Sequence, residues 1–179
     1  MTQVGSVYGE ALYDLAKSEG LSDTILQELS VLEESFHQSP DFLRLLAAQS
    51  ITKQERCAIL DDSFRDRLHL YVLNFLKILT EKGYSKHFFD CVASYREHYN
   101  RDNGILPVTA VTATALTADQ AARLTEKLAA VTGKTIQLRN RLDPEVLGGI
   151  RLEYDGKSLD GTIACRLDAI RSKLKNTAL

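Results

Sequence analysis

The apolar residues of the first hundred positions recur with the period of an α-helix. Between positions 4 and 16 they follow the i, i+3, i+4, i+7 spacing, which predicts a first helix that ends at Gly20. A second predicted helix follows Ser22 and stacks four apolar residues on one face, Ile25, Leu29, Leu32 and Phe36. A third begins at Ser39-Pro40, a capping residue followed by proline at the first helical position.

Three more helices are predicted before position 104. Thr52-Lys53-Gln54-Glu55 has the form of a capping box, ahead of a stripe of Cys57, Leu60 and Phe64. Residues 68–79 are apolar nearly all round and are followed by Gly83, so we expect this fifth helix to be surrounded by other helices. A sixth helix from about Lys86 carries an aromatic and aliphatic stripe. The pattern predicts a six-helix bundle.

The pattern changes after Asn103-Gly104. Residues 105–113 are rich in Val and Thr, which predicts a strand, and the capping box at Thr117 opens a helix that carries Leu124, Leu128 and Val131 and ends at Gly133. Alternation at 136–139 and 150–154 predicts two further strands, with a tight turn at Asp155-Gly156. A last helix is expected from near Asp160, stacking Ile163, Leu167, Ile170 and Leu174. We therefore expect an α+β fold: a helical bundle over 1–104, then a small α+β domain over 105–179 with two helices on one sheet face.

Charge and composition narrow the classes of protein. The chain has 22 Lys+Arg and 24 Asp+Glu, which gives a net charge of −2 and argues against a polybasic nucleic-acid binder. Residues 1–104 hold 11 basic and 16 acidic side chains, a net charge of −5, whereas residues 105–179 hold 11 and 8, a net charge of +3. This difference indicates two unlike binding surfaces, or a chance distribution of solvated charges. The longest uncharged run, 103–118, is too short and polar to insert in a membrane.

The candidates for chemistry are few. The sequence contains no phosphate-cradling glycine loop, and its three cysteines are too far apart for a zinc knuckle. His87, Cys91 and His98 share one helical face but lack a fourth ligand, which favours a polar flank over a metal site. Asp143 and Asp160 could act as an acid and a base, or hold a turn and a helix N-terminus. We expect no metal, no cofactor and no catalysis, and a binding or scaffold protein; a helical nucleic-acid-binding adaptor and a small enzyme are the alternatives.

Residues 143–163, followed by Arg166-Leu167, resemble the C-terminal signature of the δ subunit of F-type ATP synthase, the family of the mitochondrial oligomycin-sensitivity-conferring protein. Its structural positions here are Asp143, Gly148, Gly149, Asp160 and Gly161. The segments 8–13 and 74–83 are similar to the family's first and fifth helices. The chain departs from the pattern at Gly9, where alanine is common, at Tyr84, where arginine is usual, and at Thr162, where serine is usual.

The resemblance implies a non-catalytic peripheral-stalk (stator) subunit that links the catalytic α3β3 head to the b-subunit stalk during proton-driven ATP synthesis. It implies one copy per hetero-oligomeric complex, at the cytoplasmic face of the cell membrane, with no cofactor and no nucleic acid. In the family, the first and fifth helices form a groove for the N-terminal helix of an α subunit. The corresponding positions here are Val4, Tyr8, Ala11, Leu15, Asn74 and Ile78. For the b-subunit contact of the C-terminal domain they are Arg166, Ile170, Arg171 and Leu174.

Overall fold

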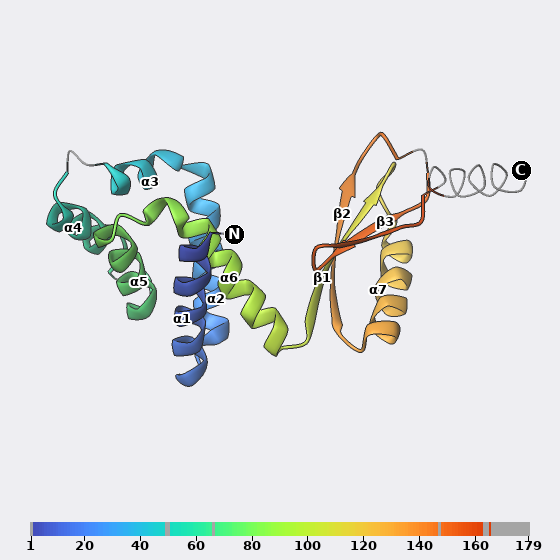
Figure 1. The fold of residues 1–179 in the computed structure, drawn as a ribbon, viewed down its shortest axis with the longest axis horizontal. Coiled ribbons are helices and arrows are strands. Elements are labelled where there is room, and N and C mark those ends of the chain that lie inside the picture. Colours follow the sequence, from blue (N-terminus) through green and yellow to red (C-terminus); the bar gives the residue numbers. More distant parts are fainter. Residues whose placement is uncertain (1, 49–50, 66, 147, 163–164, 166–179) are drawn as a thin grey trace, which may run out of the picture. The chain divides into compact units, whose positions relative to one another are not determined.

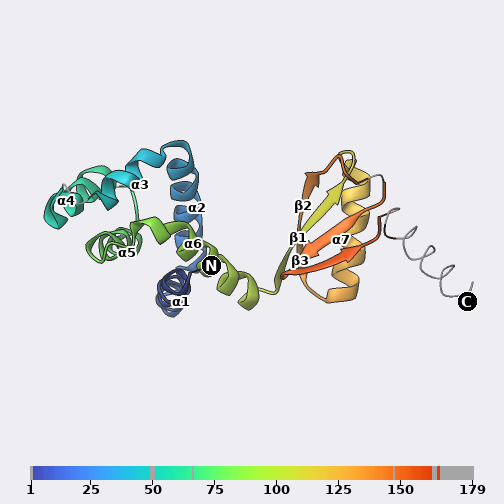
Figure 2. The ribbon, with the colours of Figure 1, turned by 45° about the horizontal axis from the view of Figure 1, so that its top comes forward.

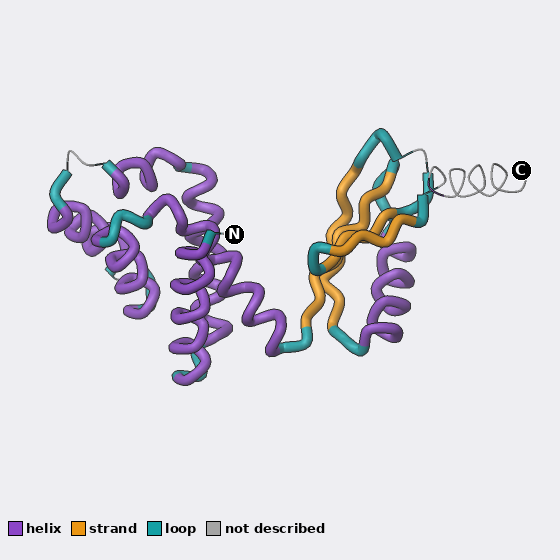
Figure 3. The backbone as a smooth tube through the Cα atoms, in the orientation of Figure 1, coloured by secondary structure: helices purple, strands orange, loops and turns teal. Residues whose placement is uncertain are grey.

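The computed structural model describes residues 2–48, 51–65, 67–146, 148–162 and 165. The chain divides into two compact units, one that ends at Tyr99 and one that begins at Asn100. The chain changes from helix to strand between Asp102 and Ile105 (Figure 3). The expectation that 1–104 folds as an independent domain stays a prediction.

The first unit is helical, and the described residues include all six predicted helices (Figure 1). These helices are α1 (Gln3–Ser18), α2 (Ser22–Gln38), α3 (Pro40–Ala47), α4 (Lys53–Phe64), α5 (Leu70–Glu81) and α6 (Phe88–Asp102), with a 3-10 turn, η1 (Ser85–His87), before α6. The predicted capping box is present at α4. The Thr52 hydroxyl accepts from the Glu55 backbone N–H, and the Glu55 carboxylate accepts from the Thr52 N–H at 2.9 Å.

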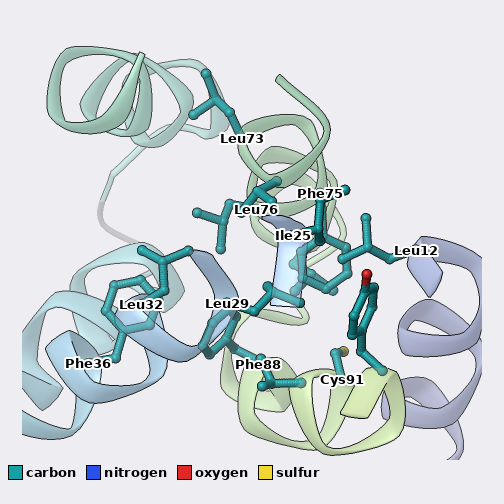
Figure 4. Packing of buried hydrophobic residues seen from close by; sticks show 14 of the residues in the cluster. Leu12, Ile25, Leu29, Leu32, Phe36, Leu73, Phe75, Leu76, Phe88 and Cys91 are labelled. Carbon is teal, nitrogen blue, oxygen red and sulfur yellow. The ribbon is translucent and has the colours of Figure 1, made fainter. Parts of the chain in front are cut away.

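A single apolar core holds this unit together. Leu12 of α1, Ile25 and Leu29 of α2, Phe75 of α5 and Phe88 of α6 point into it (Figure 4). All four residues of the predicted α2 stripe are buried, which confirms that prediction. Burial of aliphatic and aromatic side chains is the main stabilising contribution for such a bundle.

The predicted core face of α1 is partly wrong. The buried residues are Gly5, Gly9, Leu12, Tyr13 and Ala16, whereas Val7, Ala11 and Leu15 are exposed. The two glycines explain the difference, because they let α1 approach α6 closely: a Cβ added at Gly9 would lie 2.4 Å from the Cys91 carbonyl oxygen. The face with small residues therefore packs inward, although the neighbouring face is more hydrophobic.

The predicted enclosure of α5 is also wrong. Its buried side carries Val72, Phe75, Leu76 and Leu79, but Leu70, Asn74 and Ile78 are exposed on the opposite side. Hydrophobicity on every side of a helix predicts complete burial only if other helices cover every side. Within the described residues, one side of α5 has no such cover, so the sequence pattern leaves an apolar surface in contact with water.

The second unit combines a mixed sheet with one described helix. Its elements are β1 (Ile105–Thr112), α7 (Ala118–Thr132), β2 (Thr135–Leu142), β3 (Arg151–Tyr154) and β4 (Lys157–Asp160). The strand order is β2-β1-β3-β4, with β1 and β2 parallel and the other pairs antiparallel. Helix α7 connects β1 to β2 and lies on one face of the sheet (Figures 1 and 2). The α+β fold class is confirmed.

In this unit, the predicted helix caps and the predicted tight turn are confirmed, whereas one predicted apolar position is exposed and one strand was not predicted. The Thr117 capping box and the left-handed Gly133 C-cap delimit α7, and Asp155-Gly156 has φ of 45° and 69° in the β3–β4 turn. Val131 lies on the predicted helix, but it is 85% exposed and does not belong to the core. Strand β4 was not predicted, because all four of its residues are exposed and show no alternation. The predicted last-helix positions Ile163, Leu167, Ile170 and Leu174 lie outside the described residues.

Candidate docking face on the helical unit

Helices α1 and α5 each present an apolar stripe to solvent. On α1, Val7 is 57% and Leu15 41% exposed, with Val4 and Tyr8 half-buried and Ala11 exposed beside them. On α5, Leu70 is 61% and Ile78 45% exposed, with Asn74 exposed between them. The spacing of four residues along α5 keeps its three side chains on one side of the helix.

The two stripes lie on neighbouring helices (Figures 1 and 2). Helix α5 lies beside α1 in both views of the molecule (Figures 1 and 2), and Leu12 and Phe75 meet in the core beneath them (Figure 4). The Tyr8 ring packs edge-on against Tyr84, just beyond the end of α5, with ring centroids 5.9 Å apart. Tyr84 is therefore a packing partner of α1. We call the combined surface the docking face and define it by Val4, Val7, Tyr8, Ala11, Leu15, Leu70, Asn74 and Ile78.

Helix α6 fixes α1 in place beneath this surface. The Thr2 hydroxyl donates to Asp90 Oδ2 at 2.7 Å, and the Thr2 backbone N–H donates to the same oxygen at 3.2 Å. The Thr2 hydroxyl also accepts from the Gly5 N–H as the N-cap of α1. The hydrogen bond from the Thr2 hydroxyl lowers the pKa of the Asp90 carboxyl. One turn further on, the Ser94 hydroxyl donates to the Ser6 carbonyl at 3.2 Å.

The six positions named from the family resemblance lie on α1 and α5: Val4 and Tyr8 are half-buried, and Ala11, Leu15, Asn74 and Ile78 are exposed. Their role in binding stays a prediction. Sequence reasoning missed Val7 and Leu70 as members of the same surface. Val7 belongs to the apolar repeat of α1, and Leu70 lies four residues before Asn74, so helical spacing alone could have identified both. The sequence does not show which stripe of each helix faces outward.

The proposed metal candidates lie in three different surroundings. His87 Nδ1 lies 3.3 Å from the Thr2 hydroxyl, and the His98 ring packs against Tyr13. Cys91 is buried, and burial raises the pKa of its thiol to about 12, which disfavours the thiolate that zinc requires. Among the described residues, no three His, Cys, Asp or Glu side chains are grouped as a metal site would need.

The two remaining histidines have ordinary structural contacts. His69 is the N-cap of α5, and its Nδ1 accepts from the Tyr71 backbone N–H, as a capping role predicts. The His37 ring stacks on Phe89 with centroids 4.4 Å apart. Neither geometry places a base against a nucleophile.

In the α+β unit, the signature residues gather around Arg151 of β3. Its guanidinium pairs with Asp143 at 3.3 Å and with Glu153 at 3.4 Å, and Asp160 is its neighbour across the β3–β4 pair. Asp143 also accepts from the Glu145 N–H, which holds the predicted turn. This cluster of charges was not predicted, because it depends on the pairing register of strands that are distant in sequence.

The role expected for Asp160 at a helix N-terminus stays a prediction, because the expected helix positions Ile163, Leu167, Ile170 and Leu174 lie outside the described residues. Asp160 ends β4, and its carboxylate accepts from the Thr162 N–H at 2.8 Å, while the Thr162 hydroxyl accepts from the Cys165 N–H. The backbone approaches closely at Gly149, where an added Cβ would lie 2.7 Å from the Gly161 carbonyl oxygen. Asp143 and Asp160 thus hold backbone turns, and their arrangement supports a structural role.

The positions expected to contact the b subunit, Arg166, Ile170, Arg171 and Leu174, lie outside the described residues. None of the helices in the described part of the chain combines the length and the apolar character needed to cross a membrane.

Comparisons with known proteins identify the family of this chain. Residues 4–174 match the family model of the ATP synthase delta (OSCP) subunit. The ATP synthase subunit delta of Alkaliphilus oremlandii is 32% identical over 171 residues, covering 96% of this chain and 95% of that protein. That of Lacticaseibacillus casei is 32% identical over 168 residues, covering 93% and 92%.

A solved structure shares the fold at lower sequence identity. The match is a chain in the cryo-EM structure of the Toxoplasma gondii mitochondrial ATP synthase hexamer, with a TM-score of 0.78 and 18% identity over 97% of this chain and 98% of that chain. At this identity the match supports the fold alone. Together, the family model and the full-length relatives show that the chain belongs to the δ (OSCP) subunit family and is a non-catalytic peripheral-stalk component of F-type ATP synthase.

Proposed function

We propose that this subunit joins the catalytic α3β3 head to the b-subunit stalk, with the docking face binding the N-terminal helix of an α subunit. The observation that carries the proposal is the exposure of Val7, Leu15, Leu70 and Ile78 on two adjacent helices. Contiguous apolar surface of this kind is characteristic of interaction sites. An amphipathic helix with anchors at i, i+3, i+4 and i+7 is the partner that such a surface fits.

The mechanical task favours apolar contact. A stator must keep the head from turning, so its contacts must dissociate slowly under load. Exposed ion pairs contribute little and are screened by salt, whereas buried aliphatic side chains contribute roughly 1.5–3 kcal/mol each when burial is complete. Since Leu70 and Ile78 are about half exposed, each has about half of that contribution left for a partner. The fixed position of α1 on α6 adds to affinity, because less order is lost on binding.

The α+β unit carries the second contact in this proposal. Arg166, Ile170, Arg171 and Leu174 are the positions that would grip the b subunits, and they remain a prediction. One copy of the chain would act per complex, peripheral to the membrane at its cytoplasmic face. The excess of 16 acidic over 11 basic side chains in residues 1–104 opposes the alternative of a nucleic-acid-binding helical domain.

The test uses the full chain and a synthetic peptide with the N-terminal sequence of the α subunit from the same organism. Tyr8→Asp and Ile78→Asp should each weaken binding at least about tenfold, because a carboxylate would be desolvated in an apolar contact. Val31→Asp is the matched control, since Val31 is 64% exposed on α2, a helix that contributes no residue to the docking face. Equal affinities of all three variants, with unchanged folding, would refute the proposal.

A further inference from the structure

Asn74 is the one carboxamide in a surface that is otherwise aliphatic or aromatic. It is exposed on α5, with Leu70 one turn before it and Ile78 one turn after it. Among the described residues its side chain makes no hydrogen bond, so water satisfies it in the free subunit. Lys77, three residues further along the helix, is paired with Asp61 on α4 at 2.7 Å.

The helical geometry places Asn74 in the middle of the exposed stripe. A step of four residues advances an α-helix by slightly more than one turn, about 40° beyond it. Leu70, Asn74 and Ile78 therefore lie at successive angles around α5, with Asn74 between the other two. A partner helix that covers both Leu70 and Ile78 must also cover Asn74 and remove its water.

We infer that Asn74 sets the register of the docked helix by requiring a hydrogen-bonding side chain opposite it. The inference rests on the proposed function, since it concerns the same docking face. A buried carboxamide without a partner is costly, so a helix that presents leucine at this point binds less tightly than one that presents a polar side chain. A single buried asparagine fixes the register of coiled coils in the same way, at some expense of affinity.

The partner helix must therefore present one polar side chain in addition to its apolar ones. The docked helix carries aliphatic anchors toward Val7, Leu15, Leu70 and Ile78, and one Ser, Thr, Asn, Gln or charged residue at the height of Asn74. Sliding the helix by one turn would place an aliphatic residue on the carboxamide, which would be left unsatisfied. Asn74 therefore contributes specificity, whereas Leu70 and Ile78 contribute affinity.

The test is a double-mutant cycle on the full chain. The probes are the α-subunit N-terminal peptide and a set of variants in which each polar residue of that peptide is replaced in turn by leucine. The wild-type subunit should lose about tenfold in affinity for one of these peptides, and Asn74→Leu should restore tight binding of that same peptide. Gln27→Leu, an exposed amide-to-leucine change on α2, is the control and should leave every affinity unchanged.

The outcomes separate the inference from the proposed function. Binding of the parent peptide without coupling between Asn74→Leu and any peptide substitution would overturn the inference and leave the docking face intact. Absence of binding to every peptide by the wild-type subunit would overturn the proposed function, and the inference with it. Coupling to one position, confirmed by rescue with Asn74→Leu, would establish the register of the docked helix.

Discussion

Replacing Gly9 by alanine tests whether close packing of α1 on α6 determines which face of α1 is buried. An added Cβ would lie 2.4 Å from the Cys91 carbonyl oxygen and 2.6 Å from Ser94 Cβ, well inside the 3.4 Å of ordinary contact. The helices would have to separate by about 1 Å, and such overpacking typically costs ~1–3 kcal/mol. Alanine is the better helix former by about 1 kcal/mol, which offsets part of this cost.

We therefore expect Gly9→Ala to lower the free energy of unfolding of the helical unit by about 1 kcal/mol, measured by urea denaturation of the full chain followed by circular dichroism. Glu10→Ala, at the next and exposed position, is the control and should change stability little. The sign of the change in unfolding free energy shows whether α1 packs closely on α6. If Gly9→Ala is more stable than the wild type by the helix-propensity difference, α1 does not pack on α6 as described.

Two further changes test local features of the helical unit. Thr52→Ala removes the hydroxyl half of the α4 capping box and should cost ~1 kcal/mol of unfolding free energy, checked by chemical denaturation against Thr52→Ser. The lowered pKa of Asp90 means that its carboxylate stabilises the folded state above the ordinary Asp pKa, and this contribution is lost as pH falls through the folded-state pKa. Asp90→Asn should thus be less stable than the wild type at pH 7, and the difference should shrink below about pH 4, measured by thermal melts across pH; a difference independent of pH would contradict this assignment.

Local signals in the sequence predicted the elements of this fold well. Capping at Thr52 and Thr117, the left-handed Gly133 and the Asp155-Gly156 turn each depend on a few adjacent residues, so they can be identified without knowledge of the tertiary structure. Strand β4 could not be found this way, because the alternation that marks a strand arises from burial of one face, and β4 buries neither.

The orientation of the helices depended on contacts distant in sequence. The hydrophobic pattern of α1 favours the stripe that contains Val7 and Leu15, but Gly5 and Gly9 turn the neighbouring face toward α6. In α5, apolar residues on every side left no polar face to point outward. Both helices carry more hydrophobic residues than the core buries, and the sequence shows this surplus. Only the structure shows which of these residues are exposed and form the docking face.

The cluster around Arg151 was missed for a related reason. Asp143, Arg151 and Asp160 meet only through the register of β3 with β4 and the loop that precedes β3. The family resemblance identified Asp143 and Asp160 as structural positions, but it did not supply the arginine between them. Pairing across strands cannot be read from spacing along one strand.

Methyl NMR of the full chain, titrated with the α-subunit N-terminal peptide, shows whether the peptide binds the docking face, and a chain of 20.0 kDa is well suited to this method. We expect intermolecular contacts to the methyl groups of Val7, Leu15, Leu70 and Ile78, while those of Val31 and Val131 remain unchanged. Peptide contacts that instead centre on Val31 or on α7, with the methyl groups of α1 and α5 unperturbed, would contradict this expectation.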